Sequence, residues 1–296
     1  MRKTALALIL VLVLVFSAVI VTLFIRLATQ THSAITIRPD GSIEGTSQIQ
    51  RQGDTYTLTG NLSCGIDVQR SDIVIDGAGY AIKGDGEGRG IDLTNRHGVD
   101  PSRAQIKNVT VKNLKIINFS HAIEFVPSVN DTFIGNYVAD CAIGFNIWWT
   151  ANHTLMRNTI ENCVIGITIS FGGSGNVITE NNILNSSVFV MFSPDNTVDG
   201  NYWSDYLTRY PNATEIGDSG VWDTPYEVRD SLTDNHPLVE PVAVNPEFLD
   251  GEPFPTTLVI GSVIIVAVIG IGLSVYFKKR SHARTNQHSE IEQPSI

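Results

Sequence analysis

The chain has 296 residues, of which 43% are hydrophobic, and this length suits one or two domains. Its formal net charge of −10 argues against a nucleic-acid partner, because no basic stripe offsets phosphate charge. The sequence also lacks a phosphate-binding glycine loop, a nucleophile elbow and a paired-histidine zinc helix. It therefore gives no support to the enzyme classes that these motifs mark.

Residues 5–25 form an apolar run that follows Arg2 and Lys3. The run is long enough to cross ~30 Å of hydrocarbon as a helix. Residues 1–30 are therefore expected to be a signal peptide or a signal anchor. The run exceeds the ~7–15 residues of a usual signal core, which slightly favours retention. The preceding basic residues predict a cytoplasmic N-terminus and an extracytoplasmic domain at residues 31–243.

Short runs typical of β-strands begin after this segment. Residues 56–68 are expected to form an initial rung of a stacked structure and residues 73–82 an irregular one. Gly, Asp, Asn and Pro are frequent in residues 84–103, which predicts an insertion loop around a strand at residues 91–93. Residues 35–55 are expected to cap the exposed strand edges at the start of the stack.

A repeat of about 22 residues dominates the middle of the chain. Four series of positions keep this period, and repeats of roughly 20–50 residues indicate stacked architectures. Two series are apolar: Val111, Phe133, Leu155, Ile178 and Val198; then Ile116, Val138, Ile160, Ile183 and Trp203. Two consist of Asn and Asp: Asn118, Asp140, Asn162, Asn185 and Asp205; then Asn136, Asn158, Asn181 and Asn201.

The repeating unit is predicted to be β rather than α. Apolar residues recur in pairs at spacing two, as in Ile123 and Phe125, and period two places both on one face of a strand. Amphipathic runs of the 10–12 residues that helical repeats need are missing, as is the pattern of a leucine-rich repeat. The sequence thus predicts an all-β fold, a parallel β-helix of roughly six or seven rungs with Asn at its corners.

Residues 201–243 are expected to cap the other end of the stack. They are rich in Asp and Glu, and carboxylates in a loop could bind calcium, with Asp218 and Asp223 as weak candidates. The spacing fits no EF-hand. A cap whose carboxylates bond to nearby backbone amides is therefore the favoured alternative, and no other cofactor is expected.

The remaining residues are predicted to attach the domain to a membrane. Residues 244–257 contain Pro and suit a semi-rigid stalk. Residues 258–277 form an uncharged apolar run that fits a transmembrane helix, and the basic start of residues 278–296 predicts a cytoplasmic tail. Both termini are then cytoplasmic if the first segment is retained.

Two kinds of modification fit an exported chain. Seven Asn-x-Ser/Thr sequons are candidate glycosylation sites, although a repeat rich in Asn and Thr also produces them by chance. They are Asn61, Asn108, Asn118, Asn130, Asn152, Asn185 and Asn212. Cys141 and Cys163 lie one repeat apart, where the ~4.8 Å strand spacing suits either a disulfide or two buried thiols.

Several short motifs carry a resemblance to a known family. They are YTLTG at 56–60, IVIDGAG at 73–79, NYWSDY at 201–206, DTPY at 223–226 and DNHPL at 234–238. These motifs resemble NosD-like right-handed β-helix proteins, in particular the membrane-anchored surface versions common in archaea. The resemblance implies a right-handed parallel β-helix over residues 56–243. It associates the chain with carbohydrate binding, sugar hydrolysis, surface layers or copper-site maturation, although soft copper ligands are scarce here.

One row of residues is the candidate ligand-binding site. Three of its members lie 22 residues apart between inward neighbours and are expected to point outward together. The row comprises Glu124, Asn146 and Thr168, with Asp92 as an extension. Trp148 should also point outward and Trp149 to the opposite face. Such a row beside an indole suits a glycan, whereas an ordinary solvated surface is the favoured alternative.

The same row contains two candidate catalytic residues, Asp92 and Glu124. A glycosidase needs two carboxyl groups roughly 5–10 Å apart, and Asp92 and Glu124 qualify if their rungs are adjacent. The insertion between them leaves this open, and no dense cluster of carboxylates with Lys or Arg suggests a lyase. The sequence therefore favours a protein without enzymatic activity.

The sequence favours a membrane-anchored surface protein with a binding or structural role. Carbohydrate, another surface polymer or surface-layer components are its expected partners. A polysaccharide-active hydrolase or lyase is one alternative. An accessory protein for a membrane complex or for metal-site maturation is the other.

Overall fold

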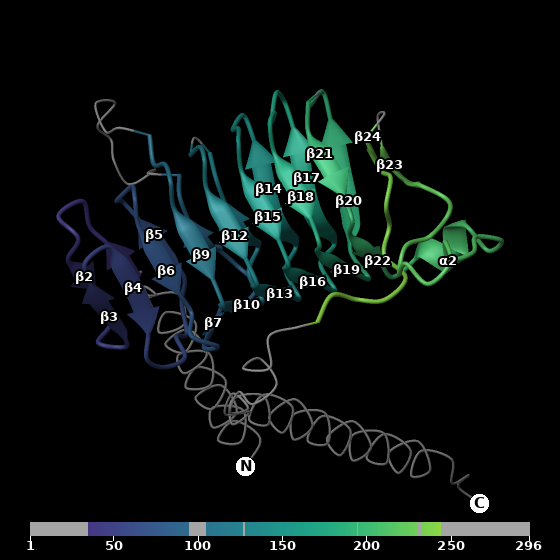
Figure 1. The fold of residues 1–296 in the computed structure, drawn as a ribbon. Coiled ribbons are helices and arrows are strands. Elements are labelled where there is room, and N and C mark those ends of the chain that lie inside the picture. Colours follow the sequence, from purple (N-terminus) through teal and green to yellow (C-terminus); the bar gives the residue numbers. More distant parts are fainter. Residues whose placement is uncertain (1–34, 95–104, 127, 194, 230–231, 244–296) are drawn as a thin grey trace, which may run out of the picture. The chain divides into compact units, whose positions relative to one another are not determined.

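The computed structural model describes residues 35–94, 105–126, 128–193, 195–229 and 232–243 (Figure 1). These residues all lie in one compact unit, Met1–Asp250. Within them, no helix has the length and apolar character needed to cross a membrane. The signal or anchor segment, the stalk, the second apolar run and the tail lie outside the described residues.

Three sheets of short strands build the fold (Figure 1). In order of pairing, sheet A contains β2 (Ile43–Glu44), β1 (Ile35–Ile37), β5 (Ile66–Val68), β8 (Arg89–Asp92), β11 (His121–Glu124), β14 (Ile143–Trp148), β17 (Ile165–Ser170) and β20 (Ser187–Met191). Sheet B contains β21 (Thr197–Asp199), β18 (Val177–Thr179), β15 (Thr154–Met156), β12 (Thr132–Ile134), β9 (Thr110–Lys112), β6 (Val74–Asp76), β4 (Thr55–Leu58) and β3 (Ile49–Gln52). Sheet C contains β22 (Tyr202–Trp203), β19 (Asn182–Leu184), β16 (Thr159–Glu161), β13 (Tyr137–Ala139), β10 (Lys115–Ile117) and β7 (Ala81–Lys83).

The chain passes through sheets B, C and A in turn, and almost every strand pairs in parallel with the strand one rung away. Sheet C has six strands, and in the turn of β4 and β5 the isolated bridge from Leu62 to Ile82 stands in place of a strand. The structure is therefore a parallel β-helix with turns of about 22 residues, which confirms the predicted β fold.

The two predicted apolar series fill the inside of the coil. Phe133 of β12 pairs with Val111 and Leu155 on the neighbouring rungs, and Val138 of β13 pairs with Ile116 and Ile160. All of these side chains are buried. A single rung leaves its apolar residues open above and below, so only stacking removes them from water.

Buried Asn residues hold the bend between sheets B and C. Asn158 Oδ1 accepts hydrogen bonds from the backbone N (3.0 Å) and Nδ2 (3.0 Å) of Asn136, one rung away. Asn181 and Asn201 continue the same ladder. Each amide thus satisfies a backbone N–H that the bend removes from the sheet, and buried N–H groups need such a partner.

A second ladder follows the bend between sheets A and B. It runs through Asp131, His153, Asn176 and Asn196, each accepting a hydrogen bond from the backbone N–H one rung before it. Asp131 and His153 are fully buried. Desolvation raises the pKa of Asp131 to about 7 and lowers the pKa of His153 to about 3. Burial thus favours the neutral form of both side chains.

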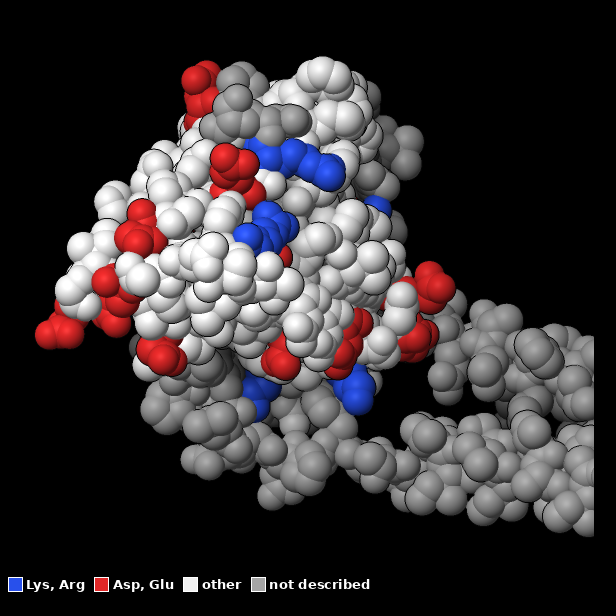
Figure 2. Space-filling model, turned by 90° about the vertical axis from the view of Figure 1, so that its right-hand side faces the viewer, with Lys and Arg blue, Asp and Glu red and all other residues white. Residues whose placement is uncertain are grey.

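Both ends of the coil are covered. At the N-terminal end, β2 and β3 pair antiparallel with β1 and β4. The other end carries α2 (Tyr206–Arg209) and a hairpin of β23 (Tyr226–Arg229) and β24 (Leu232–Asp234). In this cap the ring of Trp203 stacks on that of Tyr226 at 4.1 Å between centroids. Seen from that side, acidic side chains are scattered over the described surface with few basic ones between them (Figure 2).

Candidate functional site

The outer face of sheet A carries a row of mainly polar residues. Its members pair in register on six neighbouring strands, so each lies about one strand spacing, ~4.8 Å, from the next. From the N-terminal to the C-terminal end, this sheet A row consists of Asp67, Asp92, Glu124, Asn146, Thr168 and Phe189. The sequence predicted the four middle residues. It missed Asp67 because the first rungs are irregular.

The first half of the row is acidic and is contacted by the side chains of Arg89 and His121. Arg89 Nη1 lies 3.2 Å from an Asp92 carboxylate oxygen, and Arg89 Nε lies 3.7 Å from Glu124 Oε2. His121 Nε2 lies 3.7 Å from the same Glu124 oxygen. On the other side, Asn146 Nδ2 donates a hydrogen bond to Glu124 Oε1 at 3.0 Å. The Glu124 side chain is only 3% exposed, so this network stabilises a buried carboxylate.

The rungs that carry Asp92 and Glu124 are adjacent, which the sequence had left open. Asp92 and Glu124 are direct partners on β8 and β11, although part of the predicted insertion at residues 84–103 separates them in the sequence. Their carboxyl groups share one guanidinium. The Arg89 side chain that joins them pairs in register with His121 on the next rung, and the sequence did not indicate this role.

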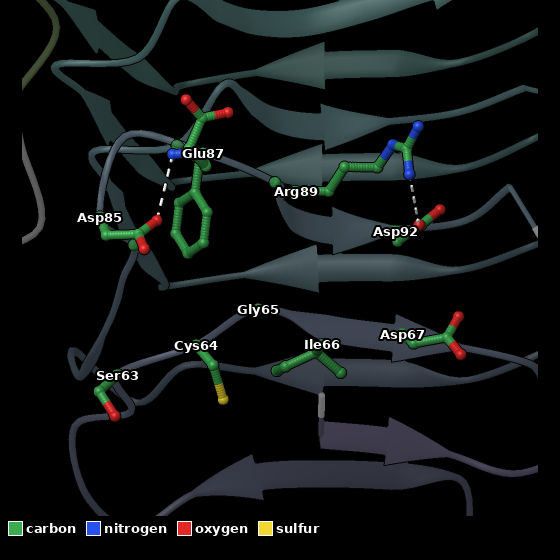
Figure 3. A pocket seen from close by; sticks show the side chains of 12 residues that line it. Ser63, Cys64, Gly65, Ile66, Asp67, Asp85, Glu87, Arg89 and Asp92 are labelled. Carbon is green, nitrogen blue, oxygen red and sulfur yellow. Dashed lines mark hydrogen bonds and ion pairs between the residues drawn. The ribbon is translucent and has the colours of Figure 1, made fainter. Parts of the chain in front are cut away.

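A pocket of about 300 Å³ opens beside the acidic half (Figure 3). Its size is at the lower end of the range for small-molecule sites. In Figure 3, Asp67, Arg89 and Asp92 line one end, and Cys64 lies toward the other. Burial raises the pKa of the Cys64 thiol, which keeps the sulfur protonated. Asp85, Glu87, Ser63 and Phe119 complete much of the remaining wall.

The second half of the row is uncharged and borders exposed aromatic rings. Trp148 ends β14, and the next residue, Trp149, adopts φ 52° in the following turn. The two indoles stack at 5.3 Å with an interplanar angle of 21°, and Trp149 is 66% exposed. The prediction that Trp149 faces the opposite side is therefore wrong, because the strand ends at Trp148 and side chains no longer alternate.

Phe171 and Phe192 occupy the position of Trp149 on the next two rungs. Both follow the ends of sheet A strands, both adopt φ 51°, and both are exposed. The Trp148 and Phe171 centroids are 6.0 Å apart, and those of Phe171 and Phe192 are 6.4 Å apart. We call Trp149, Phe171 and Phe192 the aromatic edge. The aromatic edge was not predicted from the sequence, although its spacings of 22 and 21 residues are visible there.

Two buried polar atoms in this half have no hydrogen-bond partner: Trp148 Nε1 and Thr168 Oγ1. The Thr168 side chain lies in the row between Asn146 and Phe189, and the residue is 8% exposed. Buried polar atoms in proteins are nearly always paired. The two atoms therefore keep an unused hydrogen-bonding capacity just beneath the outer face of this half of the row.

The calcium candidates do not come together as a site. Asp223 accepts hydrogen bonds from the backbone N and the hydroxyl of Thr214, which hold the pKa of this carboxyl below its usual range. Asp218 is exposed in a neighbouring turn. Over the described ranges, no three His, Cys, Asp or Glu residues are grouped so that they could hold a metal ion. The geometry thus supports the alternative of a locally bonded cap.

The candidate disulfide residues lie one rung apart. Cys141 and Cys163 are both buried free thiols here. Cys141 Sγ accepts a hydrogen bond from the backbone N of Phe119 at 3.4 Å and donates to the carbonyl oxygen of Ala139 at 3.2 Å. This is the arrangement of two buried thiols in a ladder, and oxidation to a disulfide stays a prediction.

The sequons fall mainly on the corners of the coil. Asn118 is partly buried, and the other six sequon residues are exposed. Five of the seven adopt positive φ values, a conformation that Asn tolerates well: Asn108, Asn118, Asn130, Asn152 and Asn185. Their backbone geometry alone explains Asn at these five positions, and glycosylation stays a prediction.

Comparison with known proteins supports the family resemblance. Residues 85–216 match the family model described as NosD, periplasmic copper-binding protein. Searches among curated proteins and among solved structures found no match. The matched segment runs from the pocket to the start of the C-terminal cap and contains most of the sheet A row. The described domain is thus a NosD-like parallel β-helix.

The described residues do not fit the copper that this family's description mentions. Copper sites in proteins are built from convergent His, Cys and Met side chains. Here Cys141 and Cys163 are buried and bonded to backbone groups, and both ring nitrogens of His153 are hydrogen-bonded at the corner of the coil. The described segments hold no cluster of three His, Cys, Asp or Glu residues suited to a metal ion.

Proposed function

We propose that this domain lies outside the cytoplasm and binds an extended carbohydrate across sheet A. The observation that carries the proposal is the in-register sheet A row, whose uncharged half borders exposed aromatic rings and leaves Thr168 Oγ1 unpaired. A sugar presents hydroxyl groups at its edge and an apolar C–H face. Polar side chains with open hydrogen-bonding capacity and an aromatic ring nearby match both features.

The location follows from the same proposal. The NosD family is described as periplasmic, which is consistent with an exported β-helix. The apolar runs at residues 5–25 and 258–277 would then hold the domain at the outer side of a membrane. Protease added to intact cells should cleave the β-helix domain but leave an epitope tag after residue 296 intact. Protection of the whole chain would contradict this orientation.

The test of binding uses Thr168→Val, which removes the unpaired hydroxyl and keeps the side-chain shape. The full-length protein in detergent would be applied to a glycan array and its best ligand measured by calorimetry. We expect the variant to bind about 3- to 10-fold more weakly, because one net hydrogen bond is lost. Its unfolding free energy should be unchanged or higher, since the hydroxyl has no partner in the free protein.

Thr159→Val is the matched control. The Thr159 hydroxyl on sheet C accepts a hydrogen bond from Asn182 Nδ2 at 3.1 Å, so its loss should lower stability without changing affinity. Equal glycan affinity for wild type and Thr168→Val would remove this residue from the site. Failure of the wild-type protein to bind any glycan would reject the proposal and leave a structural or accessory role as the better account.

Polysaccharide hydrolysis is the second candidate function, favoured by the direct pairing of Asp92 and Glu124. Neighbouring strands are ~4.8 Å apart, which is near the carboxyl separation of retaining glycosidases, ~5–5.5 Å. If the domain is an enzyme, bound polysaccharide should release reducing ends, and Asp92→Asn and Glu124→Gln should each abolish release while binding persists. Binding without release by the wild-type protein would exclude hydrolysis of that glycan.

A further inference from the structure

The aromatic edge continues in the same direction as the sheet A row. The turns after β14, β17 and β20 lie next to one another along one side of the coil (Figure 1). Each contributes one exposed ring at the same position of its rung, and the Phe171 and Phe192 centroids are 6.4 Å apart. A ligand that contacts all three rings must therefore extend along the coil axis.

The fold itself does not require aromatic residues at these positions. Trp149, Phe171 and Phe192 all adopt positive φ values, which are strained for bulky side chains and easily adopted by Asn or Gly. At the other corners of the coil this conformation is mostly taken by Asn, Asp or Gly. Strained residues that persist in a structure are concentrated at binding and catalytic sites. Three successive strained aromatics thus indicate a role in binding.

The exposure of the three rings also indicates a role in binding. Trp149 and Phe192 are 66% and 75% exposed, so their rings contribute little to the hydrophobic core. Single exposed apolar residues are common, but a contiguous group usually marks an interaction site. The neighbouring members of the row, Asn146 and Thr168, carry no charge, and the guanidinium of Arg229 lies 5.8 Å from the Phe189 ring centroid at the end of the row.

We infer that the ligand is an uncharged β-linked polysaccharide that lies lengthwise on the coil, one sugar unit per rung. This inference rests on the proposed function and specifies its ligand. The C–H faces of consecutive sugars stack on Trp149, Phe171 and Phe192. Their hydroxyl edges lie over Trp148 Nε1 and Thr168 Oγ1, the two buried atoms of this half of the row that have no hydrogen-bond partner. An extended β-linked chain presents its sugar faces at an interval close to the rung spacing, which a globular partner does not.

The test measures affinity as a function of oligosaccharide length. Linear β-1,4-linked glucose and N-acetylglucosamine oligomers of one to six units would be titrated into the full-length protein in detergent. We expect the association constant to rise by about 3- to 10-fold with each unit up to the trimer, because each ring adds one stacking contact. For oligomers longer than the trimer, which already covers the aromatic edge, the association constant should stay constant. An affinity independent of length would overturn the inference.

Asn substitutions remove the rings without straining the backbone. Trp149→Asn, Phe171→Asn and Phe192→Asn should each weaken trimer binding by about 3- to 10-fold and leave monomer binding largely unchanged. Their melting temperatures should be equal to or above that of the wild type, since Asn suits positive φ values. Leu207→Ala, which changes an exposed apolar residue of α2 outside sheet A, should alter neither property.

The outcomes separate this inference from the proposed function. If Thr168→Val weakens glycan binding but the three Asn variants do not, the sheet A site stands and the lengthwise placement is wrong. If no glycan binds the wild-type protein, both fail. A change of the Asn variants in sedimentation or in binding to lipid vesicles, with unchanged glycan affinity, would instead assign the aromatic edge to a second copy of the chain or to a lipid surface.

Discussion

Single residues at the two ends of a rung meet very different environments. Thr168 is buried on the outer face of sheet A with its hydroxyl unpaired, whereas His153 is buried at a corner with both ring nitrogens bonded. The hydrogen bonds of His153 have a structural role, because His153 takes the place of an Asn in the ladder. Distinguishing the two requires the hydrogen-bond partners and cannot rest on burial alone.

The pair Asp131 and His153 leads to a prediction about pH. Asp131 has its pKa raised from 3.8 to about 7, so its contribution to stability is complete below pH 3.8 and is lost as the pH rises to 7. His153 has its pKa lowered from 6.5 to about 3, so its contribution is complete above pH 6.5 and is lost as the pH falls to 3. Between pH 4 and 6.5 the two effects oppose each other, and we expect little net change from this pair.

Substituting either residue should expose the effect of the other. In His153→Asn, which fits the ladder, the unfolding free energy should fall by about 1.4 kcal/mol per pH unit between roughly pH 4 and 7. In Asp131→Asn it should rise with pH between roughly pH 3 and 6.5. Urea denaturation at several pH values measures both slopes. Parallel pH profiles for the two variants would contradict the assigned shifts.

Among the elements, the C-terminal hairpin has a defined part in ending the coil. Asp234 of β24 accepts hydrogen bonds from the backbone N of Gly200 and Asn201 and from the indole nitrogen of Trp203. Its carboxylate thus occupies the position that a further Asn of the ladder would have on the next rung. The last rung remains paired although no rung follows it.

Removing this cap should destabilise the coil from its C-terminal end. Asp234→Ala removes the acceptor of three donors, two of them buried, and we expect the unfolding free energy to fall by about 3 kcal/mol. Asp218→Ala, an exposed carboxylate in the same segment, is the control and should leave the melting temperature unchanged. Hydrogen exchange should speed up first in β21 and β22. A uniform change along the coil would argue against a local capping role.

On the scale of the whole molecule, stacking makes one face of the coil a continuous binding surface. Every rung adds one residue to the sheet A row, so the row changes from acidic beside the pocket to uncharged beside the aromatic edge. A mutation in one half should leave the other half intact, because each rung contacts only its neighbours. Thr168→Val and Asp92→Asn should therefore have separate, additive effects on stability.

The sequence by itself determined the repeat, and with it the β-helix and four members of the sheet A row. This was possible because each rung contacts its neighbours one period away, so that period two within a strand and period 22 along the chain place Glu124, Asn146 and Thr168 together. Wherever the period was interrupted, only the tertiary structure decided. It paired Asp92 with Glu124 across an insertion, added Asp67 and Arg89, and turned Trp149 outward where β14 ends. It also brought Asp234 to the last rung. These contacts depend on loop paths and on backbone angles after a strand, and no repeat encodes either.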